Sequence, residues 1–74
     1  MDWNVKDKVE YIVAIISEFA KAHSLTPGQA FRYLDRFHGI DFIERHYGIV
    51  HTQRFEDVID SLTDYCKRRG GAIV

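Results

Sequence analysis

The segment 25–30, Leu-Thr-Pro-Gly-Gln-Ala, marks a helix start more clearly than any other part of the chain. Thr26 and Gln29 have the spacing of a capping box, in which each side chain accepts a hydrogen bond from the backbone N–H at the other's position. Pro27 follows at the first helical position, where the N–H that proline lacks would have no intrahelical partner. We therefore predict a helix over residues 27–38.

Apolar residues recur at helical spacing in three further stretches, which predicts helices over 4–22, 42–47 and 54–69. One face of the first stretch is expected to be buried, and it consists of Val5, Val9, Ile12, Val13, Ile16, Phe19 and Ala20. The corresponding face of the last stretch consists of Phe55, Val58, Ile59, Leu62, Tyr65 and Cys66. Ile15 and Tyr11 widen the apolar arc of the first stretch, so we expect that helix to be covered on more than one side.

Glycines and acidic caps separate these stretches. Gly39 is expected to end the helix over 27–38, and Asp41 with Glu44 repeats a capping spacing that would start the short third helix. Gly48 is expected to take a left-handed conformation that ends this third helix. Gly70, with another glycine after it, is expected to end the last one.

A chain of 74 residues with 46% hydrophobic composition is one small domain with enough apolar mass for a core. A domain of this size buries only about 60% of the surface that its unfolded chain exposes, which leaves little room for a deep cleft. We therefore predict that residues 1–74 form a single all-α domain, a compact four-helix bundle-like fold with a short third helix.

The net charge of −1, from ten basic and eleven acidic residues, does not favour nucleic-acid binding. The basic run 67–69 falls at a helix end, where it complements the negative end of the macrodipole. One alternative stays open, a DNA-binding helical regulator, because residues 25–48 resemble a helix–turn–helix in pattern. Its exposed basic residues would be Arg32, Arg36 and Arg45, which alternate with Asp35, Asp41 and Glu44.

No motif in the chain indicates an enzyme. The four histidines, at 23, 38, 46 and 51, have no metal-binding spacing, and the glycines match no phosphate-binding loop. Cys66 falls on an apolar stripe, where a cysteine is usually a small buried hydrophobe. We expect no catalytic residue, metal or cofactor. A single cysteine fits a reducing compartment, and no stretch approaches the ~20 apolar residues of a membrane span, so we expect a cytoplasmic protein.

Residues 46–53, HYGIVHTQ, allow two interpretations. As a turn, they would return Ile49 and Val50 to the core after Gly48, and Thr52 or a neighbour would cap the next helix. His51 would then hydrogen-bond a backbone carbonyl or the hydroxyl of Tyr47. As a site, the four side chains of His46, Tyr47, His51 and Thr52 would form part of a contact surface for another protein.

The chain resembles a family of short bacterial proteins known as domain of unknown function 3791. The resemblance is carried by Leu25-Thr26 with Ala30-Phe31, by Asp41-Phe42 with His46-Tyr47, by His51-Thr52, and by the acidic helix start at 56–60. It covers nearly the whole chain, and the segment HYGIVHT is its most specific part. Arg54 departs from the small polar cap that is frequent there.

The family has no established activity, and the resemblance implies an accessory or antitoxin-like role beside an operon-encoded partner similar to ADP-ribosyltransferases. The apolar surplus of the chain points the same way, because Trp3, Tyr11, Tyr33, Ile73 and Val74 exceed what a small core hides. We therefore expect a non-catalytic interaction domain that binds a protein partner or itself.

Overall fold

The computed structural model describes residues 5–71, and every regular element in that range is a helix. The helices are α1 (Val5–Ala22), α2 (Pro27–Arg36), α3 (Gly39–Arg45), α4 (Tyr47–Val50) and α5 (Phe55–Arg68). The predicted all-α fold is therefore confirmed. The structure differs from the predicted four helices in having α4, a fifth and very short helix in a segment for which the sequence predicted only a turn. The predicted surplus residues Trp3, Ile73 and Val74 lie outside the described residues.

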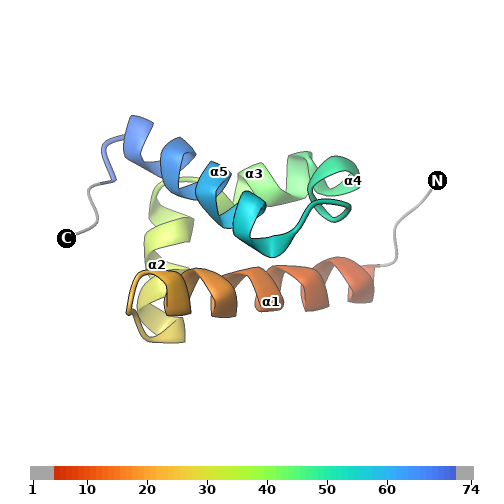
Figure 1. Ribbon diagram of the computed structural model, residues 1–74, viewed down its shortest axis with the longest axis horizontal. Helices are drawn as coiled ribbons and strands as arrows, with labels where there is room; N and C mark the ends of the chain where they lie inside the picture. Colours follow the sequence, from red (N-terminus) through yellow and green to blue (C-terminus); the bar gives the residue numbers. More distant parts are fainter. Residues whose placement is uncertain (1–4, 72–74) are drawn as a thin grey trace.

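The helices form two sides and one end of an elongated body measuring 38 × 22 × 20 Å (Figure 1). α1 runs along one side, and α3, α4 and α5 lie along the other. α2 crosses from one side to the other at the end where α1 finishes. None of the helices in residues 5–71 is long and apolar enough to cross a membrane.

The core lies where the apolar faces of these helices meet. Its fully buried large side chains are Ile15, Phe19, Leu34, Ile43, Val58, Leu62 and Cys66. On α5 the predicted stripe is confirmed in its centre, while Phe55 at its start remains 44% exposed. Burial of a large aliphatic or aromatic side chain contributes about 1.5–3 kcal/mol relative to leaving it exposed.

The buried face of α1 was predicted partly wrongly. Ile15 and Phe19 are fully buried, but Val5, Val9 and Val13 are 74%, 53% and 60% exposed. The apolar arc of α1 is wider than the surface that the other helices cover, and spacing alone does not show which edge of such an arc is covered. The three valines lie on the edge that the described part of the fold leaves open.

The start of α2 is the one that the sequence predicts. The hydroxyl oxygen of Thr26 accepts a hydrogen bond from the backbone N–H of Gln29 at 3.1 Å, and the Gln29 side-chain oxygen accepts from the backbone N–H of Thr26 at 2.9 Å. Pro27 is the first helical residue. The predicted capping box is confirmed.

The junction between α2 and α3 differs from the prediction. His38, not Gly39, takes the left-handed conformation, with φ of 65°, and Gly39 is the first residue of α3. Asp41 therefore lies within the first turn of α3 and is not its cap. Gly39 is buried, and a Cβ atom there would lie 2.7 Å from Cδ2 of Leu34 and 3.2 Å from Sγ of Cys66. This glycine is required for close packing and not for a turn.

The predicted left-handed conformation of Gly48 is also wrong, because Gly48 lies inside α4. Among the glycines of residues 5–71, Gly70 has a positive φ, of 92°, directly after the end of α5. The predicted end of the last helix is thus confirmed. The chain between α3 and α5 does not simply turn; it forms one helical turn of its own.

Candidate functional site

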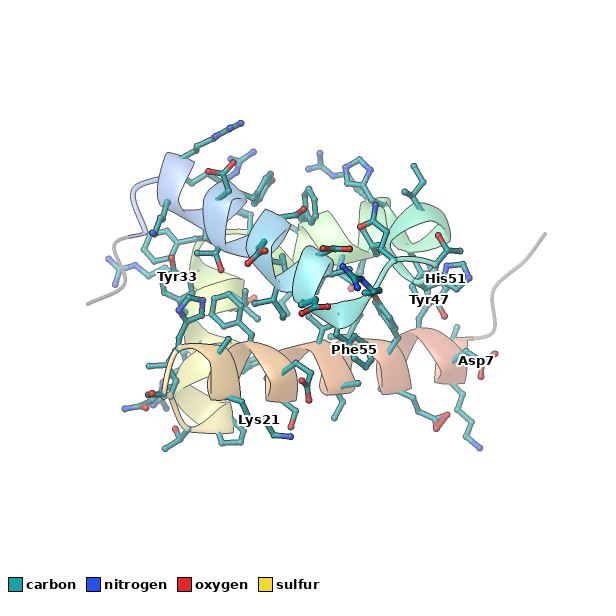
Figure 2. The ribbon with its side chains drawn as sticks, viewed as in Figure 1. Asp7, Lys21, Tyr33, Tyr47, His51 and Phe55 are labelled. Atoms are coloured by element: carbon teal, nitrogen blue, oxygen red, sulfur yellow. The ribbon has the colours of Figure 1, made fainter. Side chains whose placement is uncertain are left out.

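Tyr47 begins α4 and points toward α1, so it belongs to the core edge and not to the surface. Its side chain is only 6% exposed. Its ring meets the ring of Tyr11 edge-on, with centroids 5.5 Å apart, and stacks on the imidazole of His51 at 4.8 Å with an interplanar angle of 8°. Figure 2 shows Tyr47 and His51 toward the end of the molecule where α1 begins, with Phe55 nearer the middle of α1. Tyr47 therefore anchors the segment to α1.

His51 closes the last turn of α4. Its Nδ1 lies 2.7 Å from the backbone carbonyl oxygen of Tyr47, four residues earlier. A carbonyl only accepts, so Nδ1 carries the proton of this hydrogen bond. The predicted hydrogen bond from His51 to a backbone carbonyl is confirmed, and it is local to the turn.

Two other side chains bond two further carbonyls of α4. The hydroxyl of Tyr11 donates to the carbonyl oxygen of Val50 at 2.9 Å, and the hydroxyl of Thr52 donates to that of Ile49 at 2.7 Å. The backbone N–H groups of His51, Thr52 and Gln53 also reach the carbonyls of Tyr47, Ile49 and Val50, so each of these carbonyls accepts one backbone and one side-chain hydrogen bond. A helix of four residues is not stable alone, so these contacts and Tyr47 hold it in place.

Thr52 or a neighbouring residue was expected to cap the following helix, and the cap is a neighbour, not Thr52. The N-cap of α5 is Arg54, whose side chain makes no capping hydrogen bond. Arg54 instead forms ion pairs with Glu56 at 3.4 Å and with Asp57 at 3.5 Å. The hydroxyl of Thr52 instead donates to a carbonyl of the preceding helix, α4.

Tyr11 and Tyr33 were expected to be surplus apolar surface, but both are half-buried and each ties distant segments together. The hydroxyl of Tyr33 donates to the carbonyl oxygen of Gly71 at 2.6 Å, and its ring stacks on Phe19 at 5.7 Å. Burial raises the pKa of both tyrosines, with a smaller contribution from Tyr47 at Tyr11 and from Cys66 at Tyr33. Their hydroxyls are therefore structural hydrogen-bond donors.

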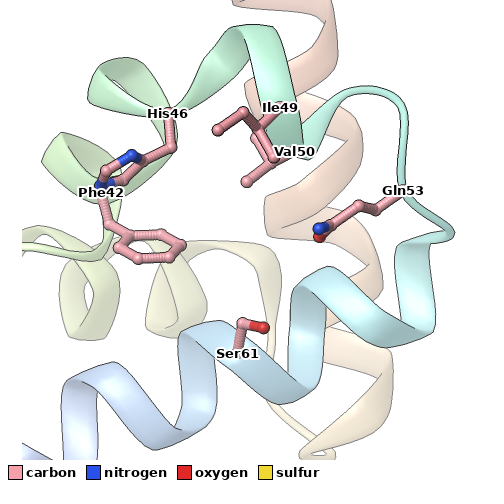
Figure 3. A pocket seen from close by; sticks show the side chains of 6 residues that line it. All are labelled: Phe42, His46, Ile49, Val50, Gln53 and Ser61. Carbon is pink, nitrogen blue, oxygen red and sulfur yellow. The ribbon is translucent and has the colours of Figure 1, made fainter.

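His46 lies apart from the Tyr47–His51 pair and borders a hollow on the other face of the segment. The hollow measures about 220 Å³ and is lined by Phe42, His46, Ile49, Val50, Gln53 and Ser61 (Figure 3). We call it the α3–α5 groove. The imidazole of His46 lies 5.0 Å from the ring of Phe42, and the side chain of Ile49 is 64% exposed.

The apolar floor of the α3–α5 groove is fixed by packing beneath it. The ring of Phe42 contacts the ring of Tyr65 at 4.7 Å, and the guanidinium of Arg69 lies over Tyr65 at 4.5 Å. Val50, at the inner edge, is 4% exposed. The groove is thus a preformed surface whose exposed apolar part is chiefly Ile49.

Charged residues beside the groove are engaged with one another. Asp64, one turn after Ser61, pairs with Arg68 at 2.8 Å. Asp57, one turn before Ser61, pairs with Arg54 at 3.5 Å. The polar side chains that line the groove are those of His46, Gln53 and Ser61. A groove with this lining suits a partner whose contacting side chain is apolar.

The four residues predicted as a contact surface are therefore divided. Tyr47 and His51 face α1, Thr52 bonds the end of α4, and His46 lines the groove. Ile49 was expected in the core together with Val50; the prediction holds for Val50 and is wrong for Ile49. No signal for the exposure of Ile49 was present in the sequence, because this segment was predicted as a turn, and only the packing of α4 shows which of its two apolar residues is covered.

Residues 5–71 contain no group of three or more histidine, cysteine, aspartate or glutamate side chains placed to hold a metal. His23 bonds the hydroxyl of Thr63 at 2.9 Å, and His38 lies 3.4 Å from a carboxylate oxygen of Asp41. Cys66 is fully buried, and its burial raises the pKa of the thiol, an effect that nearby Arg69 only partly offsets. Its thiolate is therefore disfavoured in the folded chain.

A family model described as "Protein of unknown function (DUF3791)" matches residues 10–69. The chain belongs to this family. The DUF3791 match covers α2 to α5 in full and most of α1, so it includes the whole segment from His46 to Thr52 and the α3–α5 groove. The resemblance found in the sequence is confirmed. No curated protein and no solved structure matches the chain.

Proposed function

We propose that this DUF3791 chain is a non-catalytic protein-interaction domain that binds its partner in the α3–α5 groove. The observation that carries the proposal is the exposure of Ile49, 64%, beside a hollow with an apolar floor. Large exposed apolar side chains that border a preformed hollow are typical of binding surfaces. The segment from His46 to Thr52 then has two roles: Tyr47 and His51 hold α4, and α4 presents Ile49.

The dimensions of the groove favour a protein partner over a small molecule. Its volume of about 220 Å³ lies below the ~300–1,000 Å³ of typical ligand pockets. It has the size to receive one large aliphatic or aromatic side chain from a partner's helix, with Gln53 and Ser61 at the rim to meet polar groups of that helix. The occupant that we propose is therefore an amphipathic helix with one apolar anchor residue.

Three further parts of the proposal rest on Cys66 and on the family resemblance. The buried free thiol of Cys66 fits a reducing compartment, which supports a cytoplasmic location. Its burial and raised pKa also make it a poor nucleophile, which supports a non-catalytic role. The family resemblance suggests a bacterial source and an antitoxin-like or accessory role, with the partner encoded in the same operon.

The DNA-binding alternative receives less support from the geometry. α3 would be the reading helix of a helix–turn–helix, yet it exposes the carboxylates of Asp41 and Glu44 next to Arg45. Arg68 of α5 and Arg54 at its N-cap are already paired with carboxylates of α5. Opposing carboxylates weaken contact with phosphates, so we do not propose this function.

The experiment that tests the proposal is affinity capture from the native host with matched variants. Tagged wild-type chain and Ile49→Glu are compared, with Thr52→Ala as the control on the same turn. We expect one stoichiometric protein with wild type and control and its loss with Ile49→Glu, while the circular dichroism melting curve of Ile49→Glu is unchanged. Equal capture by all three would overturn the assignment of the groove.

A further inference from the structure

The two ends of the α3–α5 groove differ in charge. Figure 3 shows Phe42 and Gln53 on opposite sides of the groove. Directly after Gln53, the side chain of Arg54 pairs with the carboxylates of both Glu56 and Asp57. Two negative charges there meet one positive charge, so the end of the groove at Gln53 is acidic.

The end of the groove at Phe42 leads to Arg69, the C-cap residue of α5. The ring of Phe42 contacts the ring of Tyr65 at 4.7 Å, and the guanidinium of Arg69 lies over the Tyr65 ring at 4.5 Å. Ser61, Tyr65 and Arg69 are each four residues apart, so they follow one another along the same side of α5. The charge of Arg69 therefore lies one to two helical turns past the groove.

Arg69 differs from Arg54 and Arg68 in its ion pairs. Both of those arginines are paired with carboxylates of α5, whereas Arg69 forms no ion pair with a carboxylate of residues 5–71. The carboxylate of Asp41, which precedes Phe42 on α3, lies 3.4 Å from His38. A guanidinium stacked on a ring keeps the N–H donors of its edge available, and their fork matches a carboxylate.

From this charge pattern we infer that the partner helix carries an aspartate or glutamate one or two turns from its apolar anchor, and that this carboxylate pairs with Arg69. The inference rests on the proposed function, because it names a second contact of the same partner. Residues on one face of a helix recur four and seven positions apart, about 6 and 10.5 Å along its axis. Tyr65 and Arg69 lie at similar distances from Ser61, about 6 and 12 Å along α5.

The same pair determines the direction in which the partner helix lies. A carboxylate at the opposite end would meet the acidic charges beside Gln53, and like charges in an interface are unfavourable. Arg69 is exposed, so its pair with a carboxylate contributes more to direction and specificity than to affinity. Loss of one exposed pair lowers affinity about 1.5–5-fold, and reversal of the charge adds repulsion.

Affinity capture from the native host tests the inference with Arg69→Glu and Lys67→Glu as baits. Lys67 is also exposed in the last turn of α5, and two residues of helix place it on the opposite side from Arg69. The two variants therefore change the net charge equally. We expect Arg69→Glu to lower recovery of the partner at least ~5-fold, and Lys67→Glu to recover it as the wild type does.

Two further measurements separate an ion pair from a loss of stability. Arg69→Gln removes the charge without reversing it, and we expect it to lower recovery about 1.5–5-fold with a circular dichroism melting curve that still shows a folded chain. Wild-type recovery should fall as the salt concentration rises from about 50 to 500 mM, and recovery by Arg69→Gln should fall less, because salt screens exposed pairs. An equal salt dependence would overturn the inference.

The captured partner supplies the reciprocal test. Arginine in place of its acidic residue one or two turns from the anchor should restore capture by Arg69→Glu. Absence of this rescue, equal recovery by wild type and Arg69→Glu, or equal loss with Lys67→Glu would overturn the inference. If Ile49→Glu still loses the partner in those cases, the groove remains assigned. Equal capture by wild type and Ile49→Glu would instead overturn the groove, and the inference with it.

Discussion

Replacing His51 tests whether the histidine of HYGIVHT holds the turn or contacts a partner. In the structure its Nδ1 donates to the carbonyl oxygen of Tyr47 at 2.7 Å, and its ring stacks on Tyr47 at 4.8 Å. His51→Ala removes both contacts and leaves α4 without one of its three side-chain donors. We expect the variant to be less stable and still folded.

The magnitude follows from the two contacts. Loss of one intramolecular hydrogen bond costs about 0.5–1.5 kcal/mol, and loss of a stacked ring pair costs about 0.5–1.5 kcal/mol more. Because His51 is half-buried, we take the lower half of the sum, about 1–2 kcal/mol for His51→Ala. His51→Phe keeps a ring on Tyr47 and lacks the donor, so it should lose about 1 kcal/mol or less.

The assay is urea unfolding followed by circular dichroism, with thermal melting as a second measure. A loss of 1 kcal/mol corresponds to a fall in Tm of about 4–8 °C in a domain of this size. Thr52→Ala is the matched control; its hydroxyl bonds the carbonyl of Ile49 in an exposed position where water replaces it, so its effect should stay within about 0.5 kcal/mol. Unchanged stability of His51→Ala would refute the structural role, and lost partner capture with unchanged stability would make His51 a contact residue.

Three other predictions concern packing and protonation. Gly39→Ala should destabilise the chain by about 1–3 kcal/mol in urea unfolding, because its Cβ would lie 2.7 Å from Cδ2 of Leu34. Gly28→Ala, with nothing within 4 Å of its Cβ, should be neutral or stabilise by up to ~1 kcal/mol. Equal changes in stability for the two variants would contradict the close packing at Gly39. The thiol of Cys66 should react with a disulfide reagent only as fast as the chain unfolds, and fast labelling under native conditions would contradict its burial. Because burial raises the folded-state pKa of Tyr11, its contribution is complete below the unfolded value of about 10 and is lost as the pH rises beyond it; Tyr11→Phe should show a shallower alkaline loss of stability, and an equally steep loss would refute this.

The sequence predicted most accurately what depends on neighbouring residues. The capping box of Thr26 and Gln29, the start of α2 and the stop at Gly70 are local features with their own chemistry, and all are confirmed. The apolar stripe of α5 is confirmed in its centre, because the charged residues of this helix all fall on the opposite side and leave one apolar face to bury. The family resemblance, carried by HYGIVHT, is confirmed over residues 10–69.

The errors arose where tertiary packing decided between two locally acceptable states. Gly39 and Gly48 each follow a helical stretch and match a helix stop, but Gly39 is needed for close contact with Leu34 and Gly48 is held in α4 by side chains from elsewhere. One of those side chains, Tyr11, lies 39 residues from the carbonyl that it bonds. No local pattern reveals such a contact.

Of the four predicted contact residues, only His46 lines the α3–α5 groove. The residues from His46 to Thr52 do border a surface hollow, but Tyr47 and His51 turn away from it, and Ile49, which was expected in the core, is exposed. Phe42, Gln53 and Ser61 were not part of the predicted set, because they come from α3, the loop before α5 and α5 itself. Only the packing of α3 against α5 brings them together.

Photo-crosslinking in the native host tests the central claim, that the α3–α5 groove binds a protein partner, most directly. Benzoylphenylalanine replaces Ile49 in the groove and, in a matched control, Lys21 at the far end of α1. We predict one adduct of defined mass that forms on irradiation with the probe at Ile49 and not with the probe at Lys21. Absence of an adduct at Ile49, or the same adduct from both positions, would contradict the account.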